Sequence, residues 1–185
     1  MNPKNEWYQN IHQDLIEKCK AQDQSAQFKI YQLYYKSMYN TSLRIVSNPA
    51  EAEDIMQEAF LAAFARIKTY KGEVSFGAWI KRIVINKSID HHRARKVKFE
   101  ELDENLELSE ENDNIDNTDM KVLLQKIKKA IEKLADGYRI ILSLYLLEGY
   151  DHEEIGQIMD ISASSSRSQL ARAKQKLLEI LNMNK

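Results

Sequence analysis

The residues most able to ligate a metal or to act in acid–base catalysis are the four histidines. A helical di-metal site places a glutamate three residues before each histidine, so that both side chains lie on one face. The residues three before His12, His91, His92 and His152 are glutamine, serine, isoleucine and glycine. The sequence has no G-x-S-x-G or H-E-x-x-H segment, and its five glycines are scattered. These patterns predict a protein that is not an enzyme and that needs no metal or cofactor.

A second group with chemical potential is an acidic cluster in the first third of the chain. It consists of Glu51, Glu53, Asp54 and Glu58. The cluster lies in a segment whose apolar residues recur with helical spacing, and no partner base accompanies it. An acidic exposed helix face beside an apolar edge is more typical of a protein docking surface than of an acid–base pair.

Charge is distributed unevenly along the 185 residues, although the formal net charge is only −1. Residues 66–99 carry ten Lys and Arg and two Asp and Glu, whereas residues 100–119 carry ten Asp and Glu and no cation. The acidic segment contains only four aliphatic residues and no aromatic one, which is too little apolar surface to offset the entropy of ordering. It is predicted to be a flexible linker between two modules.

Both modules are predicted to be helical, because the whole chain has only five Gly and two Pro. In the first module, Asn48 is a candidate N-cap and Pro49 suits the first helical position. The apolar stripe that follows them predicts a helix over about 49–68. An aromatic-rich stripe from Phe28 to Ile45 predicts an earlier helix and favours a core role over base stacking.

A third helix of the first module carries a basic, amide-bearing stripe. At 100° per residue five side chains fall on one side of this helix, opposite Trp79 and Ile83. Cations along one helix face suit a phosphate backbone, because each contact releases counterions. A merely solvated charged face is an equally good explanation of this stripe alone. Its members are Arg82, Asn86, Ile89, Arg93 and Lys96.

The second module shows the pattern of a helix-turn-helix. Asp151 and Glu154 predict a capping box for a short helix, and Ser162 predicts the cap of a final helix that carries Arg167 and Arg172. Two helices joined by about three residues, the second with small polar residues at its start, can place that second helix against DNA. Helical hairpins also serve as plain scaffold, so the pattern alone leaves both alternatives open.

Neither a membrane span nor a signal peptide is expected. No stretch approaches about 18 consecutive apolar residues, and residues 1–13 lack a basic region followed by an apolar run. The single Cys19 excludes an internal disulfide and is expected to be a small apolar residue. The expected location is cytoplasmic, without membrane insertion.

Several runs of residues resemble segments of a known protein family and follow one another in the family's order. The runs AEAEDIMQEAFL (50–61), FGAWIKRIVIN (76–86) and DHHR (90–93) resemble region 2 of extracytoplasmic-function (ECF) sigma factors of the sigma-70 family. The runs LADGYRIIL (134–142), YDHEEIG (150–156) and ISASSSRSQLARAK (161–174) are similar to region 4. The resemblance implies an all-α protein of two helical domains, a region 2 bundle and a region 4 helix-turn-helix domain. The expected divisions are an N-terminal helical extension (1–24), region 2 (25–97), an acidic linker (98–119) and region 4 (120–185).

The resemblance also implies a function and a set of residues for it. The chain would bind core RNA polymerase, recognise the −35 and −10 promoter elements and be held by an anti-sigma factor. Polymerase binding would fall to Asp54, Gln57, Glu58 and Leu61. Contacts to the melted −10 strand would come from Lys71, Gly72, Ser75, Trp79, Arg82, Asn86, Arg93 and Lys96. The −35 duplex would be read by Ser164, Ser165, Arg167, Ser168 and Arg172.

The chain departs from the family pattern at a few positions, and two rival functions stay open. Ala135 stands where Pro is usual, and Gly156 replaces Ala at the helix-turn-helix bend, which costs about 1 kcal/mol of helix propensity. Ser166 puts a hydroxyl where an apolar side chain usually packs, and Ser165 and Gln169 also differ from the common residues. The rivals are a stand-alone helix-turn-helix regulator that does not bind polymerase, and a helical adaptor that does not bind DNA.

Overall fold

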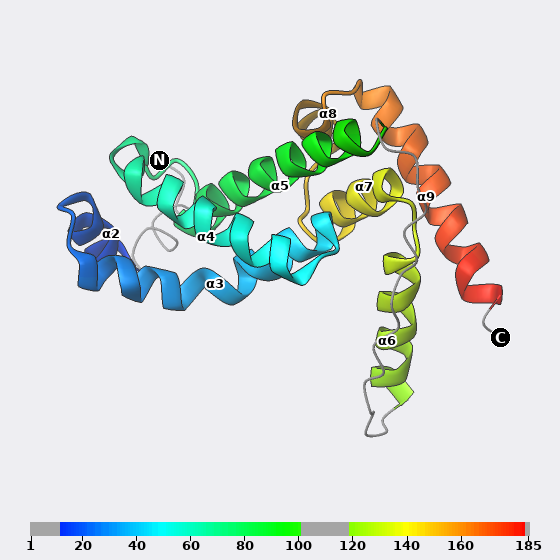
Figure 1. The fold of residues 1–185 in the computed structure, drawn as a ribbon, viewed down its shortest axis with the longest axis horizontal. Coiled ribbons are helices and arrows are strands. Elements are labelled where there is room, and N and C mark those ends of the chain that lie inside the picture. The colour runs from blue at the N-terminus through cyan, green and yellow to red at the C-terminus, as the bar shows by residue number, and fades with distance from the viewer. Residues whose placement is uncertain (1–11, 101–118, 184–185) are drawn as a thin grey trace. The chain divides into compact units, whose positions relative to one another are not determined.

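Every element in the described parts of the chain is a helix, as the sequence predicts. The computed structural model describes residues 12–100 and 119–183. The chain divides into two compact units, Met1–His92 and Arg93–Lys185, here called the first unit and the second unit. None of the described helices is both long enough and apolar enough to cross a membrane. Figure 1 shows the helices in chain order.

The described part of the first unit contains three α-helices, one short 3₁₀ helix and most of a fourth α-helix, which continues beyond His92. Asp23 caps α3 (Gln24–Val46) by accepting a hydrogen bond from the Ala26 N–H at 3.0 Å. Only Ser47 and Asn48 separate this helix from the next, so the two run back along one another (Figure 1). Asn48 accepts from the Glu51 N–H at 3.1 Å, and Pro49 takes the first helical position, as predicted. The elements are α2 (Gln13–Lys20), α3 (Gln24–Val46), α4 (Pro49–Ala65), η1 (Ile67–Thr69) and α5 (Phe76–Glu100).

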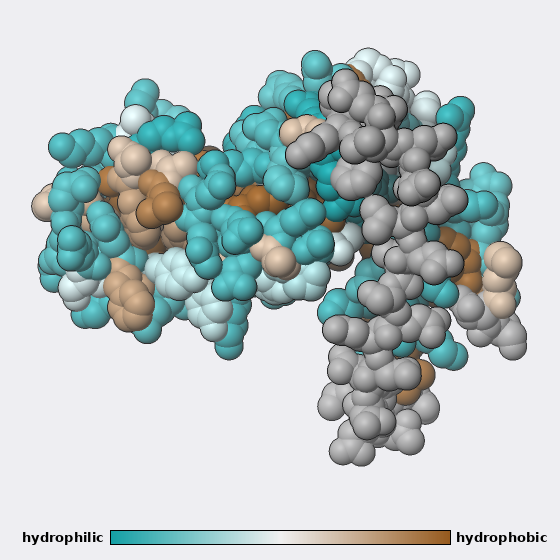
Figure 2. Space-filling model, viewed as in Figure 1, coloured by the Kyte–Doolittle hydropathy of each residue, from teal (hydrophilic) through white to brown (hydrophobic). Residues whose placement is uncertain are grey.

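The core of the first unit draws on every one of its helices. Ile30 and Met38 of α3, Phe60 of α4 and Ile80 of α5 are buried in one cluster, which α2 joins through Ile16 and Cys19. The prediction that Phe28 belongs to this core is wrong, because its side chain is 60% exposed. The helical spacing was correct, but Phe28 lies on the side of α3 that faces solvent. Figure 2 shows hydrophobic residues among hydrophilic ones on the surface of the first unit.

Cys19 is fully buried, and burial together with the nearby negative charge of Asp23 raises the pKa of its thiol from 9.0 to about 11. The native chain should therefore not react with a thiol reagent at neutral pH and should react once it is unfolded. Because the folded state keeps the thiol protonated to a higher pH, its contribution to stability is complete below pH 9.0 and is lost as the pH rises through about 11. Denaturation measured across that range checks the direction, and a native thiol that reacts at neutral pH contradicts the burial.

Residues of the predicted linker fall partly within a helix. α5 runs to Glu100, so residues 98–100 are helical, and α6 begins at Asp119. The rest of the predicted linker, 101–118, lies outside the described residues. So do residues 1–11 of the predicted extension, whose described part, 12–24, contains α2.

The described part of the second unit contains four helices and the end of α5, and it has its own core. Ile140, Ile141 and Leu144 of α7 pack in its interior together with Ile155 and Leu170. α7 is followed by Gly149, whose φ of +77° lets the chain turn toward α8. The helices are α6 (Asp119–Glu132), α7 (Asp136–Leu146), α8 (His152–Met159) and α9 (Ala163–Met183).

Local capping signals define the helix-turn-helix formed by α8 and α9. The predicted capping box is present, since Asp151 accepts from the Glu154 N–H at 2.8 Å and Glu154 accepts from the Asp151 N–H at 3.0 Å. α8 ends at Asp160 in a left-handed conformation (φ +55°). Ser162 then accepts from the Ser165 N–H at 3.0 Å and caps α9, also as predicted.

Gly156 lies at a close approach of two backbone segments in this turn, which its expected cost in helix propensity does not reveal. A Cβ at position 156 would lie 2.7 Å from the Ile161 carbonyl oxygen, well inside contact distance. The glycine lets the backbone that leads into α9 approach α8 closely.

Replacing Gly156 by alanine should destabilise the second unit. We expect the free energy of unfolding to fall by about 1–3 kcal/mol, because the clash outweighs the roughly 1 kcal/mol gained in helix propensity. Urea denaturation followed by circular dichroism measures the change. Gly137→Ala is the matched control, since no atom lies within 4 Å of a Cβ there, and it should leave stability equal or slightly raised. Equal stabilities of the two variants would contradict the role of Gly156.

Candidate polymerase and nucleic-acid interfaces

α4 presents an exposed stripe opposite its buried face. Asp54, Gln57, Glu58 and Leu61 follow the i, i+3, i+4, i+7 spacing of one helix side, and all four are exposed. Leu61 is 71% exposed. The opposite side is buried in the first unit through Ala52, Ile55, Met56, Ala59, Phe60 and Ala63. We call the four exposed residues the α4 stripe.

The α4 stripe is acidic and is held on a rigid support. α4 contains four carboxylates and no cation, and the positive end of the helix dipole favours those in its first turns. Glu58 pairs with Lys87 of α5 at 2.9 Å, and Gln57 donates to Glu53 at 3.4 Å. Both contacts are exposed, so they order side chains more than they stabilise the unit. The stripe therefore offers a negative surface with an apolar point at Leu61.

The loop between η1 and α5 is shaped by its own hydrogen bonds. Gly72 adopts a φ of +77°, a conformation that favours glycine. The Tyr70 hydroxyl donates to the Val74 carbonyl at 2.7 Å, and Ser75 accepts from the Ala78 N–H at 3.2 Å. Tyr70 is buried, and that burial raises its pKa. Lys71 is exposed at the start of the loop. Sequence reasoning missed Tyr70 as the residue that closes this loop, although an aromatic residue directly before Lys-Gly was a visible signal.

Trp79 packs against the core and is partly exposed. Its ring lies 5.4 Å from that of Tyr70 and 5.5 Å from that of Phe76, between centroids. The side chain is half-buried against the core, which leaves part of the indole at the surface beside the loop. An aromatic ring fixed on one side and open on the other can stack with a base.

The basic stripe of α5 is present in part. Arg82, Asn86 and Arg93 are exposed. Ile89 is only 3% exposed, so its placement in the stripe is wrong. The buried side of α5 turns about the helix axis, from Ile80 and Val84 in its first half to Ile85, Ser88 and Ile89 further on. The side chain of Lys96, the last predicted member, lies outside the described part of α5.

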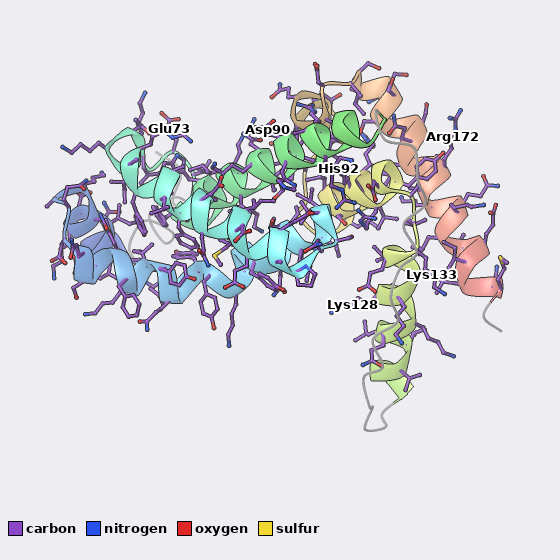
Figure 3. The ribbon with its side chains drawn as sticks, viewed as in Figure 1. Glu73, Asp90, His92, Lys128, Lys133 and Arg172 are labelled. Atoms are coloured by element: carbon purple, nitrogen blue, oxygen red, sulfur yellow. The ribbon has the colours of Figure 1, made fainter. Side chains whose placement is uncertain are left out.

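α9 separates its two faces cleanly. Ser166, Leu170 and Ala173 are buried on one side, and the predicted reading residues lie on the other. Arg167 makes a 3.6 Å ion pair with Glu153 of α8, and both side chains are more than half exposed. Such a pair is weak in water and can be exchanged for a phosphate. Figure 3 shows Arg172 further along α9. The exposed residues are Ser164, Ser165, Arg167, Ser168 and Arg172.

Two features of these interfaces bear on their chemistry. The start of α9 carries small side chains, so that its backbone can approach a phosphate closely. Among the described residues, no group of three or more His, Cys, Asp or Glu side chains is arranged to hold a metal ion. The arrangement is that of binding surfaces on two separately folded units.

Comparisons with known proteins agree with this organisation. The chain matches the family model of sigma-70 region 2 over residues 30–97 and that of sigma-70 region 4 over residues 124–177. It is 31% identical over 173 residues to the ECF RNA polymerase sigma factor SigW of Bacillus subtilis, covering 88% of this chain and 92% of that protein. It is 28% identical over 177 residues to the RNA polymerase sigma-H factor of Pseudomonas aeruginosa, covering 90% and 92%.

A solved structure has the same fold. It is the sigma factor RpoE from Bartonella quintana in complex with the anti-sigma factor NepR, with a TM-score of 0.61 and 20% identity over 85% of this chain and 97% of that one. The predicted fold class and family are thereby confirmed. The chain belongs to the ECF RNA polymerase sigma factors of the sigma-70 family.

Proposed function

We propose that the two units divide between them the recognition that an RNA polymerase sigma factor performs. Region 2, over about 25–97 and thus the first unit with the adjoining turns of α5, binds core polymerase and the melted −10 element. The second unit, with region 4 over about 120–185, reads the −35 element. The observation that supports this division most is that α4 and α9 each carry a polar, exposed face directly opposite a buried one.

The α4 stripe is the proposed site for core polymerase. Its carboxylates suit a positively charged partner, and Leu61 supplies the apolar contact around which a stable interface can form. The exposed position of all four side chains means that binding requires no rearrangement of the core.

The loop 71–75 and the adjoining face of α5 are the proposed −10 site. Flipping a base out of its stack costs a few kcal/mol, which contacts in the receiving site must offset. The Ser75 hydroxyl uses a lone pair to accept from Ala78, and its proton stays available to donate to a base. Lys71 and Arg82 supply positive charge for the strand, while Trp79 offers a ring to stack on. Gly72, Asn86, Arg93 and Lys96 complete the proposed set.

The start of α9 is the proposed −35 site. Ser164, Ser165 and Ser168 are small enough to let the helix enter a major groove, where Arg167 or Arg172 can pair with a guanine edge or a phosphate. A stand-alone helix-turn-helix regulator would use this unit alone, and the match of residues 30–97 to region 2 counts against it.

In this proposal the chain supplies binding energy and the polymerase supplies the chemistry. A factor that acts on chromosomal promoters would work in the cytoplasm. We also infer regulation by an anti-sigma factor, because the RpoE structure that shares this fold is a complex with one.

Tethered cleavage of promoter DNA tests the assignment. Cys19 is the sole cysteine and is buried, so an iron chelate can be attached to a cysteine introduced at an exposed position. With core polymerase and a promoter fragment, Glu73→Cys in the loop should cut near −10 and Ser168→Cys on α9 should cut near −35. Lys128→Cys on α6 serves as the control and should cut less at both places (Figure 3). Cutting of one and the same patch by the first two variants would contradict the proposal.

A further inference from the structure

A hydrogen bond joins the two helices of the helix-turn-helix. Ser166 of α9 is 0% exposed, and its hydroxyl oxygen lies 2.9 Å from Nδ1 of His152, the first residue of α8. A buried hydroxyl without a partner is unfavourable, so this contact satisfies a group that would otherwise destabilise the interface. The pair explains why a polar residue stands at a position that faces the interior.

The histidine is itself held in place by an aromatic neighbour. Its ring stacks on that of Tyr145 of α7, with 4.9 Å between centroids and 22° between planes. Lys174 of α9 lies 5.5 Å from the same Tyr145 ring, in the position of a cation–π contact. Three helices of the second unit therefore meet around one polar cluster, formed by Tyr145, His152, Ser166 and Lys174.

We propose that the hydrogen bond between His152 and Ser166 sets the position of α9 and thereby determines which bases of the −35 element are read. The inference rests on the proposed function, in which α9 is the reading helix. His152 and Ser166 are positioning residues, since both act through the side chains on the opposite face of α9.

The geometry of α9 explains why this contact has such an effect. Ser166 stands directly between Ser165 and Arg167, and Lys174 follows eight residues later, about 12 Å along the helix. A hydrogen bond depends on both distance and angle, whereas an aliphatic contact tolerates sliding and small rotations. A helix anchored at Ser166 and again at Lys174 has a defined rotation. A change in that rotation would move Arg172 relative to the base edges.

The hydrogen bond does not depend on one form of the histidine. A serine hydroxyl can both donate and accept, so it can pair with Nδ1 whether or not that nitrogen carries the proton. The positioning role therefore needs only a ring nitrogen and a hydroxyl at these two places.

A pair of isosteric substitutions separates the hydrogen bond from packing. Ser166→Thr keeps the hydroxyl and adds one methyl group. Ser166→Val carries a second methyl group in place of the hydroxyl, so the two variants have nearly the same shape. Full-length wild type and variants are combined with core polymerase and transcribe a promoter library randomised at −35. We expect the threonine variant to keep the wild-type base preference, and the valine variant to lose about fivefold or more of it at one or more positions. Preference at −10 should not change.

His152→Phe keeps the stack on Tyr145, removes the ring nitrogen and should alter the −35 preference as the valine variant does. The His152→Phe variant is used for the test if thermal denaturation shows that Ser166→Val does not fold. Unchanged −35 preference in folded valine and phenylalanine variants would overturn the inference, even if their stability falls. Absence of any −35 preference in the wild type would instead overturn the assignment of α9 as the reading helix.

Discussion

Replacement of Leu61 by arginine should weaken the binding of this sigma factor to core RNA polymerase by about 100-fold or more. Burying a leucine side chain in an interface contributes about 1.5–3 kcal/mol. An arginine in its place loses that term and brings an unpaired charge into the contact. Because Leu61 is 71% exposed in the free chain, the substitution should leave folding unaffected.

Leu33→Arg is the matched control for this prediction. Leu33 is also an exposed leucine of the first unit, 52% exposed, but it lies on α3 and not on the α4 stripe. Fluorescence anisotropy of labelled chain titrated with core enzyme gives both dissociation constants. Equal affinities of the two variants would show that the α4 stripe is not the polymerase site.

Removal of the Arg172 side chain should produce the largest loss in recognition of the −35 element. A contact to a guanine edge is worth about 1–3 kcal/mol, so Arg172→Ala should lower affinity for that element about 5- to 150-fold and relax the preference for one base pair. If the contact is to a phosphate, the base preference should not change. The slope of the logarithm of the DNA-binding constant against the logarithm of the salt concentration should then become shallower by about 0.9.

Lys133→Ala controls for the loss of one positive charge. Lys133 is an exposed cation of the same unit but lies in the turn directly after α6 (Figure 3). Holoenzyme binding to promoter DNA across a salt series measures both variants. An Arg172→Ala variant that behaves like Lys133→Ala would contradict the assignment of α9.

The parts of the fold that the sequence predicts well are those set by local signals. Asn48 with Pro49 predicts the start of α4, and Asp151 with Glu154 predicts the start of α8, because a cap depends on residues within one turn. The exposed face of α4 follows from ideal helical spacing for the same reason. Ser162 likewise marks the start of α9.

The parts that the sequence does not predict depend on contacts between distant residues. Ile89 lies in an exposed stripe on an ideal helical wheel, yet the buried side of α5 has turned to include it. The need for Gly156 arises from a carbonyl five residues away, on the far side of a turn. His152 and Ser166 are 14 residues apart, and only the packing of α8 on α9 brings them together.

The contact with His152 also explains why Ser166 looks unfavourable when only the sequence is considered. Judged alone, it places a hydroxyl in an apolar interface. With its partner it becomes a satisfied polar contact, and the chain compensates at position 152 for the departure at position 166.

Run-off transcription tests the central claim most directly. A fixed amount of purified core RNA polymerase is supplied with a promoter fragment, with and without this chain. We expect a transcript of defined start only when both proteins are present, its loss with Leu61→Arg, and its retention with Leu33→Arg. A promoter-specific transcript that does not depend on adding the chain, or no such transcript from any promoter of a library, would contradict the account.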